Sequence, residues 1–250
     1  MRIFLMADNW LGWQVAKHLN EQNEEIVGLA IHPEGYQHNI DEIITETKIP
    51  KKRVLVGNKN LDETFVEKVK NLVPDIILVV YWNYILPERF FSIPNMGCIN
   101  FHMAYLPYNR GKNPNVWPII EGTPAGVTMH YIDAGIDSGK IIAQKAVNVY
   151  IVDTAKSIFE KQLKTFVQLF EETWPKIKGG SIKPKLQNLS EGTVHFGKDF
   201  NRLSEINLKE KIYPLDLINQ IRAKTFEPNP SAYFMYEGKK VNISISLKYE

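Results

Sequence analysis

The segment MRIFLMADNWLGWQVAKHLNEQNEEIVGLAI, residues 1–31, decides the fold class. Residues 1–7 and 25–31 are apolar runs typical of buried strands, and Leu11, Val15 and Leu19 recur between them at the four-residue spacing of one helix face. A strand, a helix and a second strand in this order predict a parallel, right-handed unit.

The alternation continues to about residue 180. We predict further strands at 53–56, 75–81, 97–102, 126–132 and 140–147, and helices at 40–47, 61–72, 87–91, 116–121 and 154–177. The segment 75–81 is the most apolar and is predicted to be the central strand. The order is typical of an α/β, doubly wound, mostly parallel Rossmann-like sheet.

The chain changes character after the long helix. A short strand at 193–196, a helix at 214–224 and a hairpin pairing 232–236 with 240–247 indicate a small C-terminal α+β extension. We therefore predict a main domain at 1–185 and a small subdomain at 186–250. The hairpin leaves an edge that can pair in a homodimer.

Composition narrows the class of partner. The 250 residues carry 30 basic and 28 acidic side chains, for a net charge of +2, and the basic ones form no stripe. This disfavours a nucleic-acid partner. The lone Cys98 fits a reducing compartment. No signal-peptide layout is seen, and the longest apolar run falls short of the roughly 20 residues that cross a membrane, so we expect a cytoplasmic protein without a membrane partner.

The segment CINFH, residues 98–102, carries the chemistry. Asn100 and His102 are two positions apart, so on a strand both side chains leave the same face, and Asp137 follows 35 residues later in a Gly-containing loop. An imidazole can accept a proton from an attacking amine, an amide can donate to a developing oxyanion, and a carboxylate can orient the imidazole. We expect these three side chains to act in direct acyl-type transfer between two substrates.

Other readings of these residues stay open on spacing alone. Asn100 and His102 can be a satisfied structural pair, and Asp137 can be a turn residue. No G-x-S-x-G elbow is present, which disfavours a covalent acyl-enzyme, and no G-x-G-x-x-G follows the first strand. The histidines are not at paired metal-ligand spacings, so we expect no metal: they include His32, His38, His102, His130 and His195.

Several motifs in one order resemble the formyltransferases that use 10-formyltetrahydrofolate. They run from about residue 75 to 145 and include NFH at 100–102, RG at 110–111, WPI at 117–119, GVTMH at 126–130 and DAGIDSGKII at 133–142. The resemblance implies that Asn100, His102 and Asp137 are the catalytic set and that 10-formyltetrahydrofolate is the co-substrate. It also implies that two segments hold the folate, from which we name Trp82, Tyr84, Ile85, Leu86, Asp133 and Gly135. The chain departs from many members at Met103-Ala104, which replace a hydroxyl-bearing residue.

Comparison within that family reduces the set of possible acceptor amines. Glycinamide ribonucleotide transformylases have a Gly/Ser-rich phosphate loop after the first strand, where this chain has DNWLGW at 8–13. Methionyl-tRNA formyltransferases have a larger C-terminal domain and a basic surface. The sugar-nucleotide N-formyltransferases are most similar, so the expected acceptor is a dTDP-linked 4-amino-4,6-dideoxy sugar, or a 3-amino isomer, made for a surface polysaccharide such as O-antigen lipopolysaccharide.

Candidates for the sugar-nucleotide site combine stacking and anion-binding groups. Arg110 can meet the folate glutamate or the diphosphate bidentately. Trp10 and Tyr233 can stack on the ligand, although packing is the plainer role for both. The full candidate set is Asn9, Trp10, Arg110, Asn113 and Tyr233. The alternatives are formylation of another amine, on methionyl-tRNA or glycinamide ribonucleotide, and a catalytically silent folate- or nucleotide-binding module.

Overall fold

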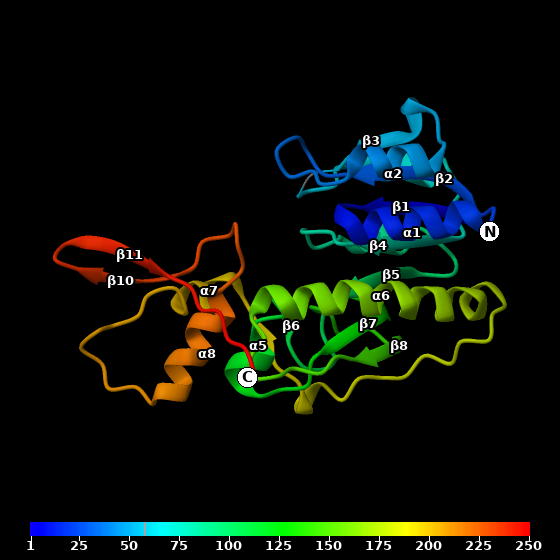
Figure 1. Cartoon of the computed structure of the whole chain (residues 1–250). Helices are drawn as coiled ribbons and strands as arrows, with labels where there is room; N and C mark the ends of the chain where they lie inside the picture. The colour runs from blue at the N-terminus through cyan, green and yellow to red at the C-terminus, as the bar shows by residue number, and fades with distance from the viewer. Residues whose placement is uncertain (58) are drawn as a thin grey trace. The chain divides into compact units, whose positions relative to one another are not determined.

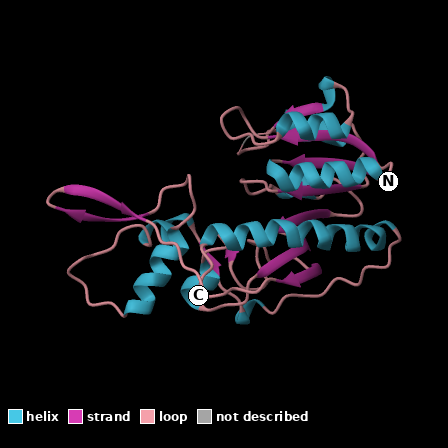
Figure 2. Ribbon diagram, in the orientation of Figure 1, coloured by secondary structure: helices cyan, strands magenta, loops and turns pink. Residues whose placement is uncertain are grey.

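The computed structural model describes residues 1–57 and 59–250. Figure 1 shows the path of the chain and Figure 2 its helices and strands. The strands are β1 Arg2–Ala7, β2 Glu25–Ile31, β3 Val54–Val56, β4 Ile76–Val80, β5 Cys98–His102, β6 Arg110–Gly111, β7 Gly126–Tyr131, β8 Ile141–Ala146, β9 Val194–His195, β10 Ala232–Tyr236 and β11 Lys239–Ile243. The α-helices are α1 Asn9–Glu21, α2 Ile40–Thr47, α3 Glu63–Lys70, α4 Glu88–Phe91, α5 Trp117–Glu121, α6 Ala155–Lys178, α7 Gly197–Arg202 and α8 Pro214–Lys224, with 3-10 turns at Lys51–Arg53 and Leu189–Glu191.

A seven-stranded sheet has the order β3-β2-β1-β4-β5-β7-β8. The pairs from β3 to β5 are parallel, and β7 runs antiparallel to β5. The strand predicted to be central, β4, is fourth of the seven, and all five of its residues are buried. Burial on both faces explains why this strand reads as a continuous apolar run. The predicted mostly parallel α/β sheet is therefore confirmed.

The chain forms two compact units. Unit 1 comprises Met1–His102, Thr128–Ala143 and Phe166–Gln187, and unit 2 comprises Met103–Val127, Gln144–Thr165 and Asn188–Glu250. Each unit is built from three separate segments of the chain, so no single position in the sequence divides the two units. The division of the chain into a main domain at 1–185 and a subdomain at 186–250 stays a prediction.

The core of unit 1 packs aromatic rings against the apolar strands. Phe4 and Phe90 meet edge to face at 6.4 Å between centroids, and Phe101 stacks on Phe166 at 5.0 Å. Phe101 points into this core because it alternates with Asn100 and His102 along β5. The alternation therefore places the polar side chains of β5 on the face opposite the Phe101–Phe166 stack.

Unit 2 has its own apolar clusters. Trp117, Ile158 and Ala223 are buried together, which joins α5, the start of α6 and α8, and Phe226 packs against them. A second cluster seats the β10–β11 hairpin on α8 through Ile221 and Ala232. Arg110 lies in the short strand β6, which pairs in parallel with β9.

No helix among the described residues is long and apolar enough to cross a membrane.

Candidate active site

The polar side chains lie where β5 and β7 run side by side in unit 1. Asn100 is the cross-strand partner of His130, and His102 is the partner of Thr128. Directly opposite residues of an antiparallel pair leave the same face with Cβ atoms about 5 Å apart. The register of the two strands therefore places His130 next to Asn100.

The Asn100 amide sits between two acceptors. Its Nδ2 lies 3.1 Å from Nε2 of His130 and donates to Oδ1 of Asp137 at 3.2 Å. Nδ1 of His130 lies 2.9 Å from the carbonyl oxygen of Tyr131, which can only accept, so Nδ1 carries the proton and Nε2 of the neutral ring accepts. Both N–H groups of the amide are thus engaged within the cluster.

His102 faces the same carboxylate. Its Nδ1 is 3.6 Å from Oδ2 of Asp137, and its ring meets the ring of His130 edge to face at 6.2 Å. The His102 side chain is 8% exposed and that of Asp137 is 16% exposed. We call Asn100, His102, His130 and Asp137 the polar cluster. It joins a carboxylate, an amide and two imidazoles in a largely buried site, where charge interactions are stronger than in water.

Asp137 is held by the turn that carries it. Its φ of +47° lies in the left-handed region, which Asp tolerates better than most side chains. Asp133 Oδ1 accepts from the N–H of Gly135 at 3.0 Å and from the hydroxyl of Ser138 at 2.6 Å. Gln187 donates to the carbonyl oxygens of Asp137 and Gly139 at 2.9 and 2.7 Å. Asp133 and Gly135, candidates for folate contact, therefore also brace this turn.

The loop after β4 holds the other folate candidates. Trp82 is stacked on His32 at 4.2 Å, with Tyr84 edge-on to both rings at 5.7 and 6.1 Å. Ile85 is 81% exposed, whereas the Leu86 side chain is buried in the core of unit 1. The Ile85 side chain is therefore open to solvent, whereas that of Leu86 is closed off in the core.

Two candidates for binding the substrate, Asn9 and Trp10, lie in the first turn of α1. Asn9 has a φ of +58°, and its Oδ1 accepts from the N–H of Leu11 at 2.9 Å. Trp10 is partly buried. Asp8, just before α1, is 1% exposed, and its carboxylate accepts from the N–H of His38 at 2.7 Å. A carboxylate at this helix start disfavours a phosphate there.

The other substrate candidates belong to unit 2. Arg110 has a buried Nε without a hydrogen-bond partner among the described residues. Asn113 has a φ of +53° at a turn. Tyr233 donates to Glu205 at 3.3 Å, and the ammonium of Lys240 lies 4.0 Å from its ring centre. Within unit 2, Tyr233 therefore already has polar and cationic neighbours.

The sequence alone assigns no role to His130 of the polar cluster or to Gln187, which holds the turn of Asp137. The GVTMH motif contains His130 without marking it as functional. The signal was the alternation in β7, which puts the polar His130 on the same face as Thr128. Gln187 had no local signal, because it reaches Asp137 from 50 positions away.

Metal and thiol chemistry have no obvious site in the described part of the chain. No group of three or more His, Cys, Asp or Glu side chains there is arranged to hold a metal ion. Burial raises the pKa of the Cys98 thiol, so this residue is not a ready thiolate nucleophile.

Known proteins share both the sequence and the fold. The chain is 30% identical over 246 residues to a methionyl-tRNA formyltransferase of Clostridioides difficile, covering 94% of this chain and 77% of that protein. It resembles a 4-N formyltransferase from Francisella tularensis with a TM-score of 0.79 and 25% identity, covering 100% and 98%. It also resembles the formyltransferase PseJ from Anoxybacillus kamchatkensis, solved with UDP-4,6-dideoxy-4-formamido-L-AltNAc and tetrahydrofolate, with a TM-score of 0.62, 26% identity and coverage of 90% and 100%.

Two family models divide the chain between them. Residues 199–249 match an N-formyltransferase dimerization C-terminal domain. Residues 13–173, which include the whole polar cluster, match the formyl transferase model. The chain belongs to the formyl transferase family, and it is a formyltransferase.

Proposed function

We propose that the chain transfers the formyl group of 10-formyltetrahydrofolate to the amino group of a nucleotide-linked amino sugar. The observation that carries this proposal is the polar cluster, in which Asn100, His102 and His130 surround the carboxylate of Asp137. The formyl donor supplies an activated carbonyl carbon. The chain's own residues must then hold two substrates together and move one proton.

His102 fits the role of proton acceptor. With Nδ1 turned toward Asp137 at 3.6 Å, Nε2 is the ring nitrogen proposed to accept a proton from the attacking amine. Asp137 then stabilises the imidazolium that forms. Asp137 is proposed to relay this proton from the imidazolium to the leaving folate nitrogen, which releases tetrahydrofolate and restores the neutral ring.

Asn100 fits the role of oxyanion donor after one exchange of partners. Its two N–H groups point to His130 and Asp137, so donation to the formyl oxygen replaces one of these bonds. The bond that is not replaced keeps the amide oriented during this exchange, so the amide itself reorganises little when charge develops on the formyl oxygen.

The loop 82–86 is our candidate for holding the folate. Ile85 is 81% exposed and follows Trp82 and Tyr84, whose rings meet edge to face; this apolar and aromatic loop suits an aromatic ligand. Asp133 and Gly135 border the site from the Asp137 turn. Leu86 contributes through its backbone because its side chain is buried.

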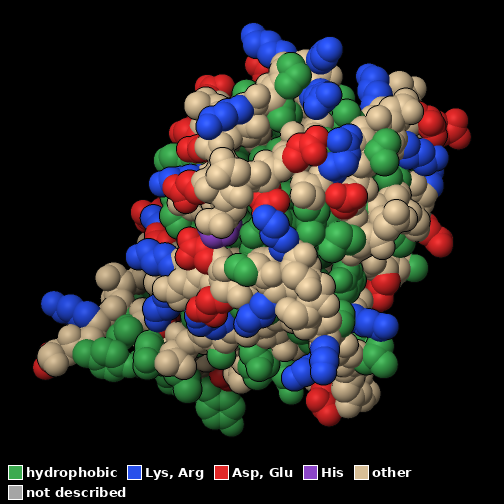
Figure 3. All heavy atoms as spheres, turned by 90° about the vertical axis from the view of Figure 1, so that its right-hand side faces the viewer, with side chains coloured by type: hydrophobic (Ala, Val, Ile, Leu, Met, Phe, Trp, Pro, Cys, Tyr) green, Lys and Arg blue, Asp and Glu red, His purple; other side chains and the backbone are tan. Residues whose placement is uncertain are grey.

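The sugar acceptor is supported by the solved structures that this chain resembles and by charge. They include a 4-N formyltransferase from Francisella tularensis and the formyltransferase PseJ, which was solved with a UDP-linked 4-formamido sugar. The face drawn in Figure 3 intersperses basic and acidic side chains. A dTDP-linked 4-amino-4,6-dideoxy sugar, or its 3-amino isomer, is the proposed acceptor, and we propose that the formylated sugar is used for a surface polysaccharide. Arg110, Asn113 and Tyr233, with Asn9 and Trp10, are the residues proposed to bind it.

Methionyl-tRNA is the second candidate acceptor, because the relative from Clostridioides difficile is named a methionyl-tRNA formyltransferase. To separate the two, the purified protein is incubated with 10-formyltetrahydrofolate and, in parallel, dTDP-4-amino and dTDP-3-amino sugars, their UDP counterparts, methionyl-tRNA and glycinamide ribonucleotide. Mass spectrometry of each acceptor and tetrahydrofolate release are measured. Formylation of methionyl-tRNA without any sugar product would reject the sugar acceptor.

We also propose that two copies associate through the C-terminal hairpin. Residues 199–249 match a dimerization domain, and Met235, Tyr236 and Val241 of the hairpin are 46%, 58% and 38% exposed. Apolar side chains left in water on one element favour association.

A further inference from the structure

A second polar group of unit 1 lies at the ends of β1 and β2, apart from the polar cluster in sequence. Asp8 follows β1 and is 1% exposed, and His32 follows β2 and is fully buried. Nδ1 of His32 lies 3.4 Å from Oδ2 of Asp8. The separation is long for a hydrogen bond, so charge–dipole attraction contributes to the contact.

His32 also reaches the loop after β4. Its Nε2 accepts from the backbone N–H of Asn83 at 3.3 Å, which places the proton of the neutral ring on Nδ1, facing Asp8. The face of the same ring stacks on Trp82 at 4.2 Å with an interplanar angle of 15°. One side chain thus contacts both the backbone and the indole of this loop.

The indole has little room to move. A Cβ added at Gly57 would lie 2.8 Å from the Trp82 ring, so this glycine permits the ring to pack where it does. Tyr84 meets the indole edge-on at 6.1 Å. The backbone of Asp8 donates to the carbonyl of Val80, which joins the end of β1 to the start of the same loop.

The charge of Asp8 is maintained by its partners. Burial disfavours the carboxylate, but the nearby His32 imidazole and the hydrogen bond from the backbone N–H of His38 outweigh it, so the pKa of Asp8 lies below its usual value. Burial, together with the charge of Asp8, raises the pKa of Tyr81, which directly follows β4. Asp8 is therefore an anion at neutral pH, and its influence reaches the residue before Trp82.

We propose that Asp8 and His32 are positioning residues that fix the loop 82–86 for the pteridine ring of the formyl donor. This inference rests on the proposed function, in which that loop holds the folate. His32 acts through Trp82 and Asn83, without touching the reacting atoms. Its loss is expected to weaken donor binding and to leave the proton transfer at His102 nearly unchanged.

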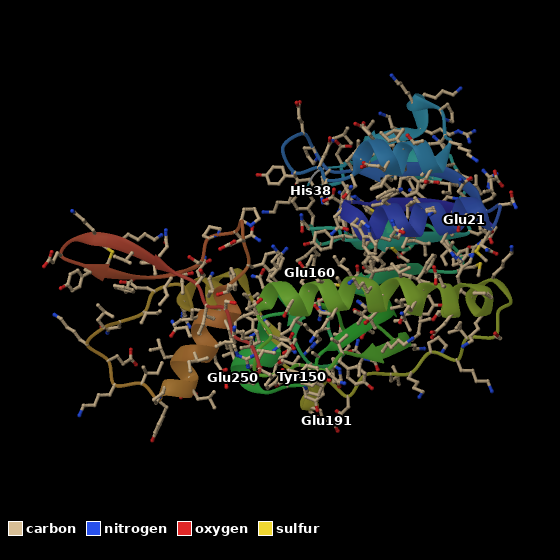
Figure 4. All side chains as sticks on the ribbon, viewed as in Figure 1. Glu21, His38, Tyr150, Glu160, Glu191 and Glu250 are labelled. Atoms are coloured by element: carbon tan, nitrogen blue, oxygen red, sulfur yellow. The ribbon has the colours of Figure 1, made fainter. Side chains whose placement is uncertain are left out.

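The chain supplies a matched control. Nδ1 of His38 lies 3.5 Å from the same Oδ2 of Asp8, but this side chain is 70% exposed. His38, labelled in Figure 4, lies on the connection before α2. The variant His38→Gln removes an imidazole from Asp8 without touching Trp82. In His32→Asn the new amide can still donate toward Asp8 but cannot reach Asn83, whereas the longer Gln of His32→Gln can reach Asn83.

The test measures kcat and KM separately for 10-formyltetrahydrofolate and for whichever acceptor the wild-type protein uses. For His32→Asn and Asp8→Asn we expect the donor KM to rise about 10-fold or more, with kcat within about 3-fold and the acceptor KM within about 2-fold. His32→Gln restores part of the loss, and His38→Gln matches the wild type. An unchanged donor KM in a folded His32→Asn, or an equal loss in His38→Gln, overturns the proposal.

A measurement on the unmodified protein covers the case in which the variants fail to fold. Nitrogen-15 NMR of the imidazoles is expected to show His32 protonated at Nδ1 in the folded state, and a proton on Nε2 instead would overturn the proposal. Failure of the proposed function is distinct, because the wild-type protein would then release no tetrahydrofolate with any acceptor.

Discussion

Asn100 donates through Nδ2 to Oδ1 of Asp137 at 3.2 Å, although 37 positions separate them in the chain. The carboxylate that faces His102 therefore also fixes the amide that is proposed to receive the oxyanion. A change at any member of the polar cluster is expected to disturb the others, so double variants should be non-additive.

Removing the base is the most direct test of the mechanism. For His102→Asn we expect kcat to fall by about 10²- to 10⁴-fold, because the amide cannot accept the amine proton. Steady-state formyl transfer is measured, with circular dichroism showing that the variant folds. A folded variant with wild-type kcat would reject the assignment of His102.

His130 is expected to matter less than Asn100. In His130→Asn the amide of Asn100 loses one orienting partner worth about 1 kcal/mol, which predicts roughly a fivefold loss of kcat. Asn100→Ala removes the oxyanion donor itself, for which we expect about 10²- to 10³-fold. Both variants are assayed at saturating substrates. Equal losses in the two variants would contradict the ranking.

Gly139 tests the turn that carries Asp137. A Cβ at this position would collide with the backbone carbonyl of Tyr131, so Gly139→Ala must shift the turn. We expect a loss of about 1–3 kcal/mol in the free energy of unfolding, together with a lower kcat. Gly197→Ala is the control, because nothing lies within 4 Å of its added Cβ. Urea unfolding and activity are measured, and equal stability of the two variants would argue against the close approach.

Asp153 in unit 2 tests a pH-dependent part of the stability. Burial disfavours its charge, but hydrogen bonds from Lys161, the backbone of Tyr150 and Ser157 lower the pKa of this carboxyl below its ordinary 3.8. A depressed folded pKa stabilises the protein above the ordinary value, and the contribution is lost as the pH falls through the folded pKa. Asp153→Asn should therefore cost about 2 kcal/mol at pH 7.

The cost of Asp153→Asn should shrink as the pH falls below 3.8. Urea unfolding of wild type and variant at several pH values gives this difference, and Asp216→Asn, an exposed carboxylate on α8, is the matched control. A cost that is the same at pH 7 and pH 3 would show that the carboxylate charge is not responsible.

The hairpin variants test association. Met235→Glu combined with Tyr236→Glu places two charges on the exposed apolar part of the hairpin, and we expect a shift from dimer to monomer in sedimentation velocity. Tyr213→Glu changes a tyrosine that is 79% exposed outside the hairpin and is expected to leave the dimer intact. A double variant that remains dimeric would reject the hairpin as the interface.

Much of the fold could be predicted locally. The strand at 25–31 and the helices at 40–47 and 214–224 have the expected bounds, because the apolar pattern that predicts each of them lies within the segment itself. The antiparallel pairing of β7 with β5 and the pairing of β6 with β9 were not predicted, because they join distant segments. Local periodicity carries no information on which strand is the neighbour.

The sequence by itself determined the α/β alternation, the central apolar strand and the candidate catalytic residues, which are Asn100, His102 and Asp137. It did so because strand periodicity assigns faces and because the motifs occur in one order. Only the tertiary structure decided that His130 and Gln187 join them and that Asp8 and His32 form a second pair. These contacts depend on strand register and on loops that meet across up to 50 positions, where the packing of the whole unit sets the distance.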